Sequence, residues 1–345
     1  MPRRNEKPKS PLMTLLCSKH CNFISRACCL SLLIVSATLF GQEEKSTSQP
    51  SVDDERVAFT DVEAPNVWEF GLELSSVGKC EAIQAFAPLP SNWPEQTIEI
   101  VDEMKTDQVD VKIAELQHNT RLIQIQIDVL LTGQTARAVA KCVVRKKNIV
   151  APRDPAALTF AKNVKGDLKA FLQESPYIEI GNSKVKKLAA SIELDSQKTP
   201  WQQVESIYEA IREKFPYEFD PTIRSCPEAI ENGKGDCEEL TSLFIAVCRI
   251  KKIPARAVWI PGHTYAEFYL IDSSGVGQWY PCQLAGTRQF GEMQESRPIL
   301  QKGDKFQVPL SPKPVRYIAP QLVAKEGACT LTWIAKQVES AKDKK

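Results

Sequence analysis

The sequence lacks the features that identify nucleic-acid-binding, metal-binding and membrane-spanning proteins. Its formal net charge is +1, from 44 basic and 43 acidic residues, so it has no basic excess to attract nucleic acid. It contains no CxxC pair, and the spacing of its cysteines and histidines matches no zinc site. No apolar run reaches the roughly 20 residues that cross a bilayer. We therefore predict no nucleic-acid partner, no metal and no cofactor.

The N-terminal segment has a composition of its own. Basic residues precede a 15-residue apolar run, ACCLSLLIVSATLFG, at positions 27–41. A basic segment followed by a short apolar core and small residues is typical of a secretory signal peptide. Because the basic segment here is long, an uncleaved membrane anchor is the alternative. We expect residues 1–41 to export the chain to the periplasm or extracellular space, touching a membrane only if uncleaved. Residues 42–55 are polar and predict a linker.

Cysteine usage is uneven along the chain. Of the 11 cysteines, four lie in the leader and seven follow it: Cys80, Cys142, Cys226, Cys237, Cys248, Cys282 and Cys329. Export would permit disulfides. An odd number cannot pair completely within one chain, so at least one thiol is expected to stay free.

Residues 56–150 alternate apolar and polar side chains. In LIQIQIDVLL, Ile123, Ile125 and Ile127 alternate with polar neighbours. Several such runs, separated by turn-forming clusters, predict a small antiparallel β-sandwich domain. This region shows no cluster of catalytic residue types, which favours a supporting or docking role.

Helical patterns begin after residue 150. Asp154 and Pro155 can start a helix that continues through 156–173, and a second helix is expected near 185–194. The sequence TPWQ at 199–202 is a capping box with proline at the first helical position, and it predicts a third helix.

Residues 151–290 are therefore predicted to form an α+β domain, in which helices precede the strand-like segments ARAVW, TYAEFYLID and QWYPCQL. Prolines recur after residue 291, so we expect 291–345 to be an irregular C-terminal extension. Within it, ACTLTWIAKQV fits a short strand or a helix.

Cys237 lies where a helix should begin. In GKGDCEELTSLFIAVCR, Leu240, Leu243, Phe244 and Val247 recur at helical spacing after two glycines. The free N–H groups and the positive dipole end of a helix N-terminus favour the reactive thiolate, and the cysteine N–H can stabilise an oxyanion. A buried structural thiol is the alternative.

Histidine is scarce, with only His20, His118 and His263 in the chain. Of these, only His263 lies in the second domain. Acyl transfer by a cysteine needs one nearby base, so His263 is the candidate partner of Cys237. A metal site built from cysteine and histidine is disfavoured because the domain has a single histidine.

The motifs GKGDCEELTSLFIAVCR, IPARAVW, HTYAEFYL and QWYPCQ stand in that order within residues 200–285 and resemble the transglutaminase-like superfamily. The resemblance implies a papain-like α+β core, with Cys237 as nucleophile and His263 as base. Tyr265 stands two positions after His263, where the family commonly has an aromatic residue, and we assign it as a substrate contact. Trp279 is assigned likewise, with packing of its strand against the core as the alternative. The β-rich first domain is similar to that of bacterial multidomain members.

One position departs from the family pattern. The third catalytic residue is usually an aspartate four residues after the tryptophan of the last strand, and that position here is Gln283. The glutamine amide oxygen can accept a ring N–H and orient His263, but it supplies no charge. Two alternatives follow: Gln283 is a neutral orienting residue, or the site is inactive.

These patterns predict an exported cysteine enzyme that acts on a protein or peptide through a thioester on Cys237. We favour hydrolysis of an amide or peptide bond over cross-linking. The alternative is an inactive binding or scaffold protein that has kept the fold.

Overall fold

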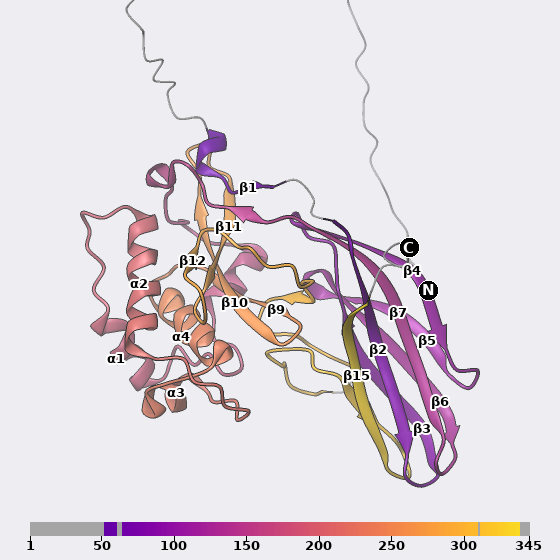
Figure 1. Cartoon of the computed structure of the whole chain (residues 1–345). Coiled ribbons are helices and arrows are strands. Elements are labelled where there is room, and N and C mark those ends of the chain that lie inside the picture. The colour runs from indigo at the N-terminus through magenta and orange to yellow at the C-terminus, as the bar shows by residue number, and fades with distance from the viewer. Residues whose placement is uncertain (1–51, 61–63, 310, 339–345) are drawn as a thin grey trace, which may run out of the picture. The chain divides into compact units, whose positions relative to one another are not determined.

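The computed structural model describes residues 52–60, 64–309 and 311–338 (Figure 1). The predicted leader, residues 1–41, lies outside the described residues, as does most of the linker. Among the described residues, no helix is long and apolar enough to cross a membrane.

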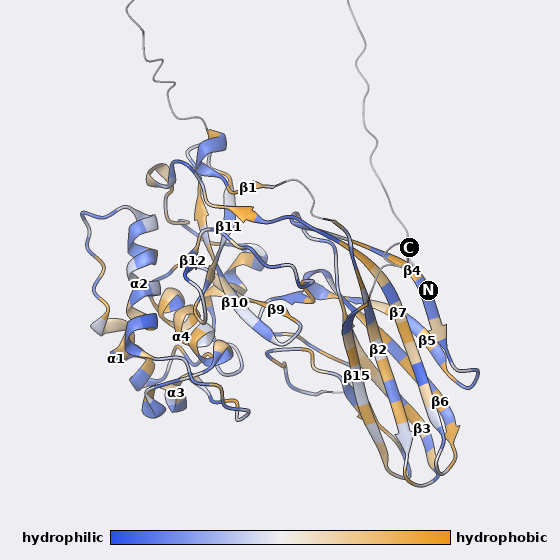
Figure 2. Ribbon diagram, viewed as in Figure 1, coloured by the Kyte–Doolittle hydropathy of each residue, from blue (hydrophilic) through white to orange (hydrophobic). Residues whose placement is uncertain are grey.

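Two four-stranded antiparallel sheets form the β-sandwich, in the orders β15-β2-β7-β4 and β14-β3-β6-β5. The strands are β2 (Asn66–Ser76), β3 (Cys80–Leu89), β4 (Gln96–Lys105), β5 (Asp110–Leu116), β6 (Thr120–Leu130), β7 (Thr135–Lys146), β14 (Gln321–Val323) and β15 (Cys329–Val338). Figure 2 shows hydrophobic and hydrophilic residues alternating along the long strands. The inward positions Ile123, Ile125 and Ile127 are buried, as the period-2 pattern predicted.

The last two strands of the sandwich come from the C-terminal segment, which corrects the prediction of an irregular extension. β15 pairs along its whole length with β2, and β14 pairs with β3. ACTLTWIAKQV is thus a strand rather than a helix. It follows the proline-rich stretch, so the prolines do not interrupt its backbone pairing.

The second part of the fold begins with helices α1 (Ser183–Ser191), α2 (Pro200–Lys214), α3 (Cys226–Asn232) and α4 (Cys237–Ile250). The predicted capping box of α2 is present, with reciprocal bonds between Thr199 and Gln202. The helix expected over 156–173 is wrong. Only 3₁₀ turns form there, η3 (Pro155–Ala157) and η4 (Gly166–Leu172). Asn163 and Gly166 have positive φ angles of 54° and 59°, which a continuous right-handed helix cannot include.

The helices pack on a five-stranded antiparallel sheet with the order β12-β11-β10-β9-β13. Its strands are β9 (Ala255–Ile260), β10 (His263–Ile271), β11 (Gly277–Gln283), β12 (Gln289–Phe290) and β13 (Gln301–Lys302). Figure 1 shows α4 between this sheet and helices α1 and α2. Residues 239–249 of α4 are all buried, so α4 is the central element of this core.

The end of the predicted linker is structured. η1 (Val52–Glu55) places the buried Glu55 carboxylate against the backbone N–H and hydroxyl of Ser273. The backbone oxygen of Glu55 accepts a hydrogen bond from the Tyr280 hydroxyl, at 2.8 Å. The following strand, β1 (Ala58–Phe59), pairs with β8 (Ile149–Val150). Residues 52–59 therefore belong to the folded domain.

Candidate active site

The start of α4 is fixed by a capping box. The Asp236 carboxylate accepts hydrogen bonds from the backbone N–H groups of Glu238 and Glu239, at 2.8 and 3.1 Å. The Glu239 carboxylate in return accepts the N–H of Asp236, at 3.0 Å. The sequence DCEE thus makes Cys237 the first residue of the helix, which is the position predicted for it.

Gly235 allows the chain to approach this cap closely. A Cβ atom at Gly235 would come within 2.8 Å of the Glu239 carboxylate, so a larger residue would displace the capping group. Gly235 also donates to the carbonyl of Pro216 and accepts from the N–H of Glu218. These two bonds hold the loop before α3 against the residues that precede the nucleophile.

The structure brings Cys237 next to the start of β10. The backbone N–H of Thr264, the residue after His263, faces the Cys237 thiol and lowers its pKa. Cys237 and His263 are both half-buried. The two residues that the sequence singled out therefore lie where α4 packs against β10.

The electrostatics of this pair favour its uncharged form. Burial raises the pKa of Cys237, and Asp236 raises it further, while the Thr264 N–H opposes both effects. Burial lowers the pKa of His263, although its hydrogen bond with Gln283 acts in the other direction. Burial thus disfavours both the thiolate of Cys237 and the imidazolium of His263.

Gln283 contacts His263 as the sequence suggested. Its Oε1 lies 2.9 Å from His263 Nε2, and its Nε2 donates to the carbonyl of Thr287 at 3.4 Å. With the amide oxygen facing the ring, the hydrogen-bond network assigns the proton to Nε2 of His263. The other ring nitrogen, Nδ1, is then free to accept a proton.

Arg212 holds the turn that carries Gln283, a role that no pattern in the sequence indicates. From α2, its guanidinium donates to the carbonyls of Gln283 and Leu284, both at 3.0 Å, and to that of Gly286 at 2.9 Å. The planar guanidinium binds three backbone oxygens at once and so fixes the end of β11.

Two further arginines reach the site from the C-terminal segment. Arg297 forms a bidentate ion pair with Glu295 and donates to the carbonyl of Pro261, at 3.0 Å. Its positive charge lowers the pKa of both Cys237 and His263. The sequence could not reveal this contact, because the segment returns to the site only through the tertiary fold.

Arg316 is the second of these arginines. It is 8% exposed, pairs with Glu238 next to the nucleophile, and packs on the rings of Tyr177 and Trp259 at 4.9 and 5.3 Å. Burial lowers the pKa of Arg316. Glu238 therefore has an ion-pair partner, in addition to its expected effect on the helix dipole.

Tyr265 does not line the site, which corrects its assignment as a substrate contact. Its side chain is completely buried, and its hydroxyl has no hydrogen-bond partner among the described residues. β10 is a central strand of its sheet, so its side chains are covered by neighbouring elements. Tyr265 is a core residue.

Trp279 lies on the same strand as Gln283 but four residues earlier. At about 3.3 Å per residue, the two are separated by about 13 Å. Its ring packs under the Arg256 guanidinium at 4.0 Å and against Phe171 and Tyr269, both at 5.2 Å. The contact of Trp279 with substrate stays a prediction. At this distance, Trp279 could touch only a part of the substrate that lies far from the reacting bond.

Asp272 does not replace the missing aspartate. Asp272 is engaged by Arg56, at 2.7 Å, and by the hydroxyl of Ser274. Within the part of the chain that the structure describes, no group of three or more histidine, cysteine or acidic residues is arranged to hold a metal ion.

A thiol at a helix start, packed on a strand that begins with histidine, defines a papain-like cysteine-nucleophile domain. Residues 186–284 match the family model of the transglutaminase-like superfamily. The order of motifs in the sequence predicted this match. No curated protein sequence matches the chain.

One of three similar solved structures shares the fold over most of both chains. A proposed cysteine protease from Cytophaga hutchinsonii has a TM-score of 0.55 at 14% identity, over 82% of this chain and 94% of that one. A structure described as a TGase has a TM-score of 0.25 at 10% identity, over 58% and 53% of the two chains. A proposed protease from Parabacteroides distasonis has a TM-score of 0.23 at 13% identity, over 64% and 47%. The first of these supports the α+β transglutaminase-like fold with its β-sandwich.

Proposed function

We propose that this protein is a cysteine hydrolase that cleaves amide or peptide bonds through a thioester on Cys237. The observation that carries the proposal is the arrangement of three groups. Cys237 begins α4 and contacts the peptide of Thr264, and His263 is oriented by Gln283. These are the nucleophile, base and orienting group that acyl transfer requires.

The reaction begins from the neutral pair. As Sγ of Cys237 attacks the carbonyl carbon, Nδ1 of His263 takes the thiol proton. The backbone N–H of Cys237 stabilises the oxyanion, and His263 returns the proton to the amine nitrogen as the C–N bond breaks. Water, deprotonated by His263, then attacks the thioester, and the S–C bond breaks to release the acid and restore the thiol.

A polypeptide substrate is supported by the surface beside the nucleophile. The loop bonded to Gly235 exposes three apolar side chains: Tyr217 is 56% exposed, Phe219 71% and Ile223 46%. Large apolar groups gathered on a surface favour contact with another chain. Exposed apolar side chains of a protein or peptide are therefore the proposed ligands of this loop.

We further propose that the enzyme acts after export, in the periplasm or outside the cell. This rests on the basic and apolar pattern of residues 1–41. The inactive scaffold is the second candidate, and the neutral Gln283 is the observation that favours it.

An electrophilic peptide probe tests the enzyme against the scaffold. Under reducing conditions, wild-type Cys237 should be labelled, Cys237→Ala should lose that label, and His263→Asn should react about 10²- to 10⁴-fold more slowly. Cys329→Ala is the matched control, because Cys329 is the other partly exposed cysteine among the described residues. Equal labelling rates at Cys237 and Cys329 would support the scaffold.

Isotope labelling separates hydrolysis from cross-linking. Peptide turnover in water enriched in oxygen-18 should place the heavy oxygen in the new carboxyl group of the product. A product joined to a lysine amine, with loss of ammonia and no heavy oxygen, would show cross-linking instead.

A further inference from the structure

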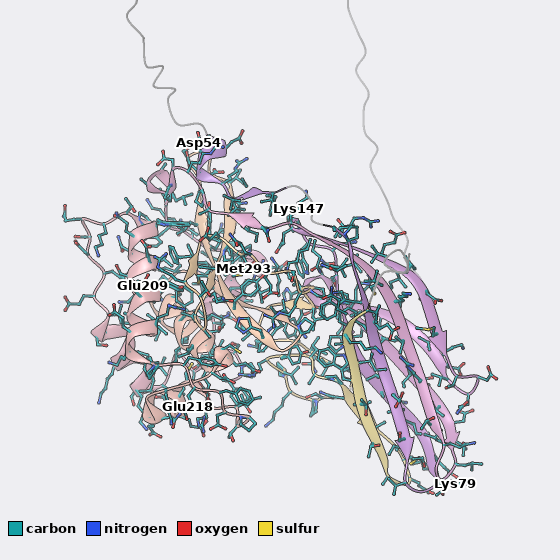
Figure 3. The ribbon with its side chains drawn as sticks, viewed as in Figure 1. Asp54, Lys79, Lys147, Glu209, Glu218 and Met293 are labelled. Carbon is teal, nitrogen blue, oxygen red and sulfur yellow. The ribbon has the colours of Figure 1, made fainter. Side chains whose placement is uncertain are left out.

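Two cysteines of the β-sandwich lie together at one end of the two sheets. Cys80 begins β3 in one sheet, and Cys329 begins β15 in the other. Figure 3 labels Lys79, the residue before Cys80, at the tip of the sandwich. Cys80 is fully buried and Cys329 is partly exposed.

Several contacts place these two residues near each other. Cys329 is the pairing partner of Ser76 on β2, and the Ser76 hydroxyl lies 3.9 Å from the Cys80 sulfur. Burial raises the pKa of Cys329, and the Cys80 thiol raises it further. Cys80 is a buried residue of the apolar core of the sandwich, and Cys329 packs against that core.

Backbone bonds hold the chain on both sides of this contact. The N–H of Glu81 donates to the carbonyl of Glu326 at 3.1 Å, and the N–H of Val77 donates to that of Ala328 at 3.2 Å. Gly327 lies so close that a Cβ atom there would come within 2.9 Å of the Cys80 Cα. The backbone beside Cys329 is therefore held against the backbone beside Cys80.

We propose that Cys80 and Cys329 are oxidised to a disulfide that joins the two sheets of the sandwich. The thiolate of Cys329, the more exposed of the two, attacks a low-molecular-weight disulfide and releases one thiol from it. The thiolate of Cys80 then attacks the mixed disulfide and releases the second thiol. Two protein thiols are oxidised and one disulfide reagent is reduced to two thiols.

The bond would fasten the C-terminal strand to the rest of the fold. β15 is an edge strand, held to the sandwich by backbone pairing with β2 alone. A cross-link between Cys80 and Cys329 closes a loop that contains almost all of the described chain, and it restricts the unfolded chain accordingly. It also leaves Cys237 as the partly exposed free thiol among the described cysteines.

Peptide mapping tests the proposal directly. The full chain is incubated with oxidised glutathione, alkylated without reduction and digested with trypsin. Cleavage after the lysines at 79, 105, 325 and 336 should yield peptides 80–105 and 326–336 as one species, lighter than their sum by two hydrogen atoms. Reduction before alkylation should separate them.

Variants distinguish this pair from other cysteines. Cys142→Ala is the matched control, a buried cysteine elsewhere in the sandwich, and should keep the linked species. Cys329→Ala should lose it. The wild-type thermal midpoint should fall by several degrees on reduction, and that of Cys329→Ala should not change with the redox state. Free alkylated Cys80 and Cys329 after oxidation, or a bond from either of them to a different cysteine, would overturn the proposal.

Discussion

Replacing Gln283 by glutamate places a charge beside His263 without changing the reach of the side chain. Glutamate and glutamine have the same length, so a carboxylate oxygen can take the position now held by Oε1, 2.9 Å from His263 Nε2. The contact that is lost, from Gln283 Nε2 to Thr287, is long at 3.4 Å and therefore weak. The main effect should be electrostatic.

The magnitude follows from the geometry. A carboxylate and an imidazolium about 4 Å apart attract by about 4 kcal/mol at an effective dielectric constant of about 20. That energy corresponds to about three pKa units. His263 is only half-buried and Arg297 lies close by, so solvent and the arginine charge reduce the effect. We expect Gln283→Glu to raise the pKa of His263 by about one to two units.

Proton-detected NMR of the histidine rings measures this shift. The chain has three histidines, and His263→Asn identifies the resonance of interest. Gln283→Asp is the graded control, because its carboxylate is one methylene shorter and should raise the pKa less. A raised pKa favours the imidazolium–thiolate pair, so alkylation of Cys237 near pH 6 should quicken about tenfold for each unit. Identical His263 titrations in wild type and Gln283→Glu would refute the contact.

Two other predictions concern the same ring. Arg212→Lys keeps the charge but loses the fork that binds three carbonyls, so activity should fall about tenfold and the pKa of His263, measured by NMR, should drop as Gln283 loosens. The second concerns pH. Because burial lowers the pKa of His263 in the folded state, protonation favours the unfolded chain, and stability should decline as the pH falls below about 6.5. Urea unfolding at pH 7 and pH 5 should therefore show a smaller loss of stability for His263→Asn than for wild type; an equal loss would contradict the shifted pKa.

The parts of the site that the sequence predicted are those built by local patterns. The cap at Asp236, the apolar spacing of α4 and the strand that begins with His263 each follow from a few neighbouring residues. Gln283 could be located because its distance from Trp279 is fixed along one strand. The packing of α4 on the sheet then brings these groups together.

The parts that the sequence missed depend on segments that meet only in the folded chain. Arg212 and Arg297 reach the site from elements far from Cys237 in sequence, and no periodicity marks them. The assignment of Tyr265 failed for a related reason. Its strand is central in a sheet, so an aromatic residue near the catalytic histidine can still be fully enclosed. The pattern of apolar residues along one strand does not show whether neighbouring elements cover both faces of that strand.

The β-sandwich also contributes to the site, through the segment that carries Arg297. The buried Gln96 side chain pairs with the backbone of Ile299, accepting its N–H at 2.6 Å and donating to its carbonyl at 2.9 Å. Lys146 donates to the carbonyl of Arg297 at 2.6 Å. These bonds anchor the backbone around Arg297, and with it the positive charge that lowers the pKa of Cys237 and His263.

The same segment continues from this anchor into the site and then back into the sandwich. It supplies Arg316 beside the nucleophile and ends in β15 on the edge of the sheet. A sandwich that loses β15 therefore also loosens the chain that holds both arginines. The sandwich therefore anchors one of the charges that act on the thiol, that of Arg297, which lowers the pKa of Cys237 against the larger effect of burial.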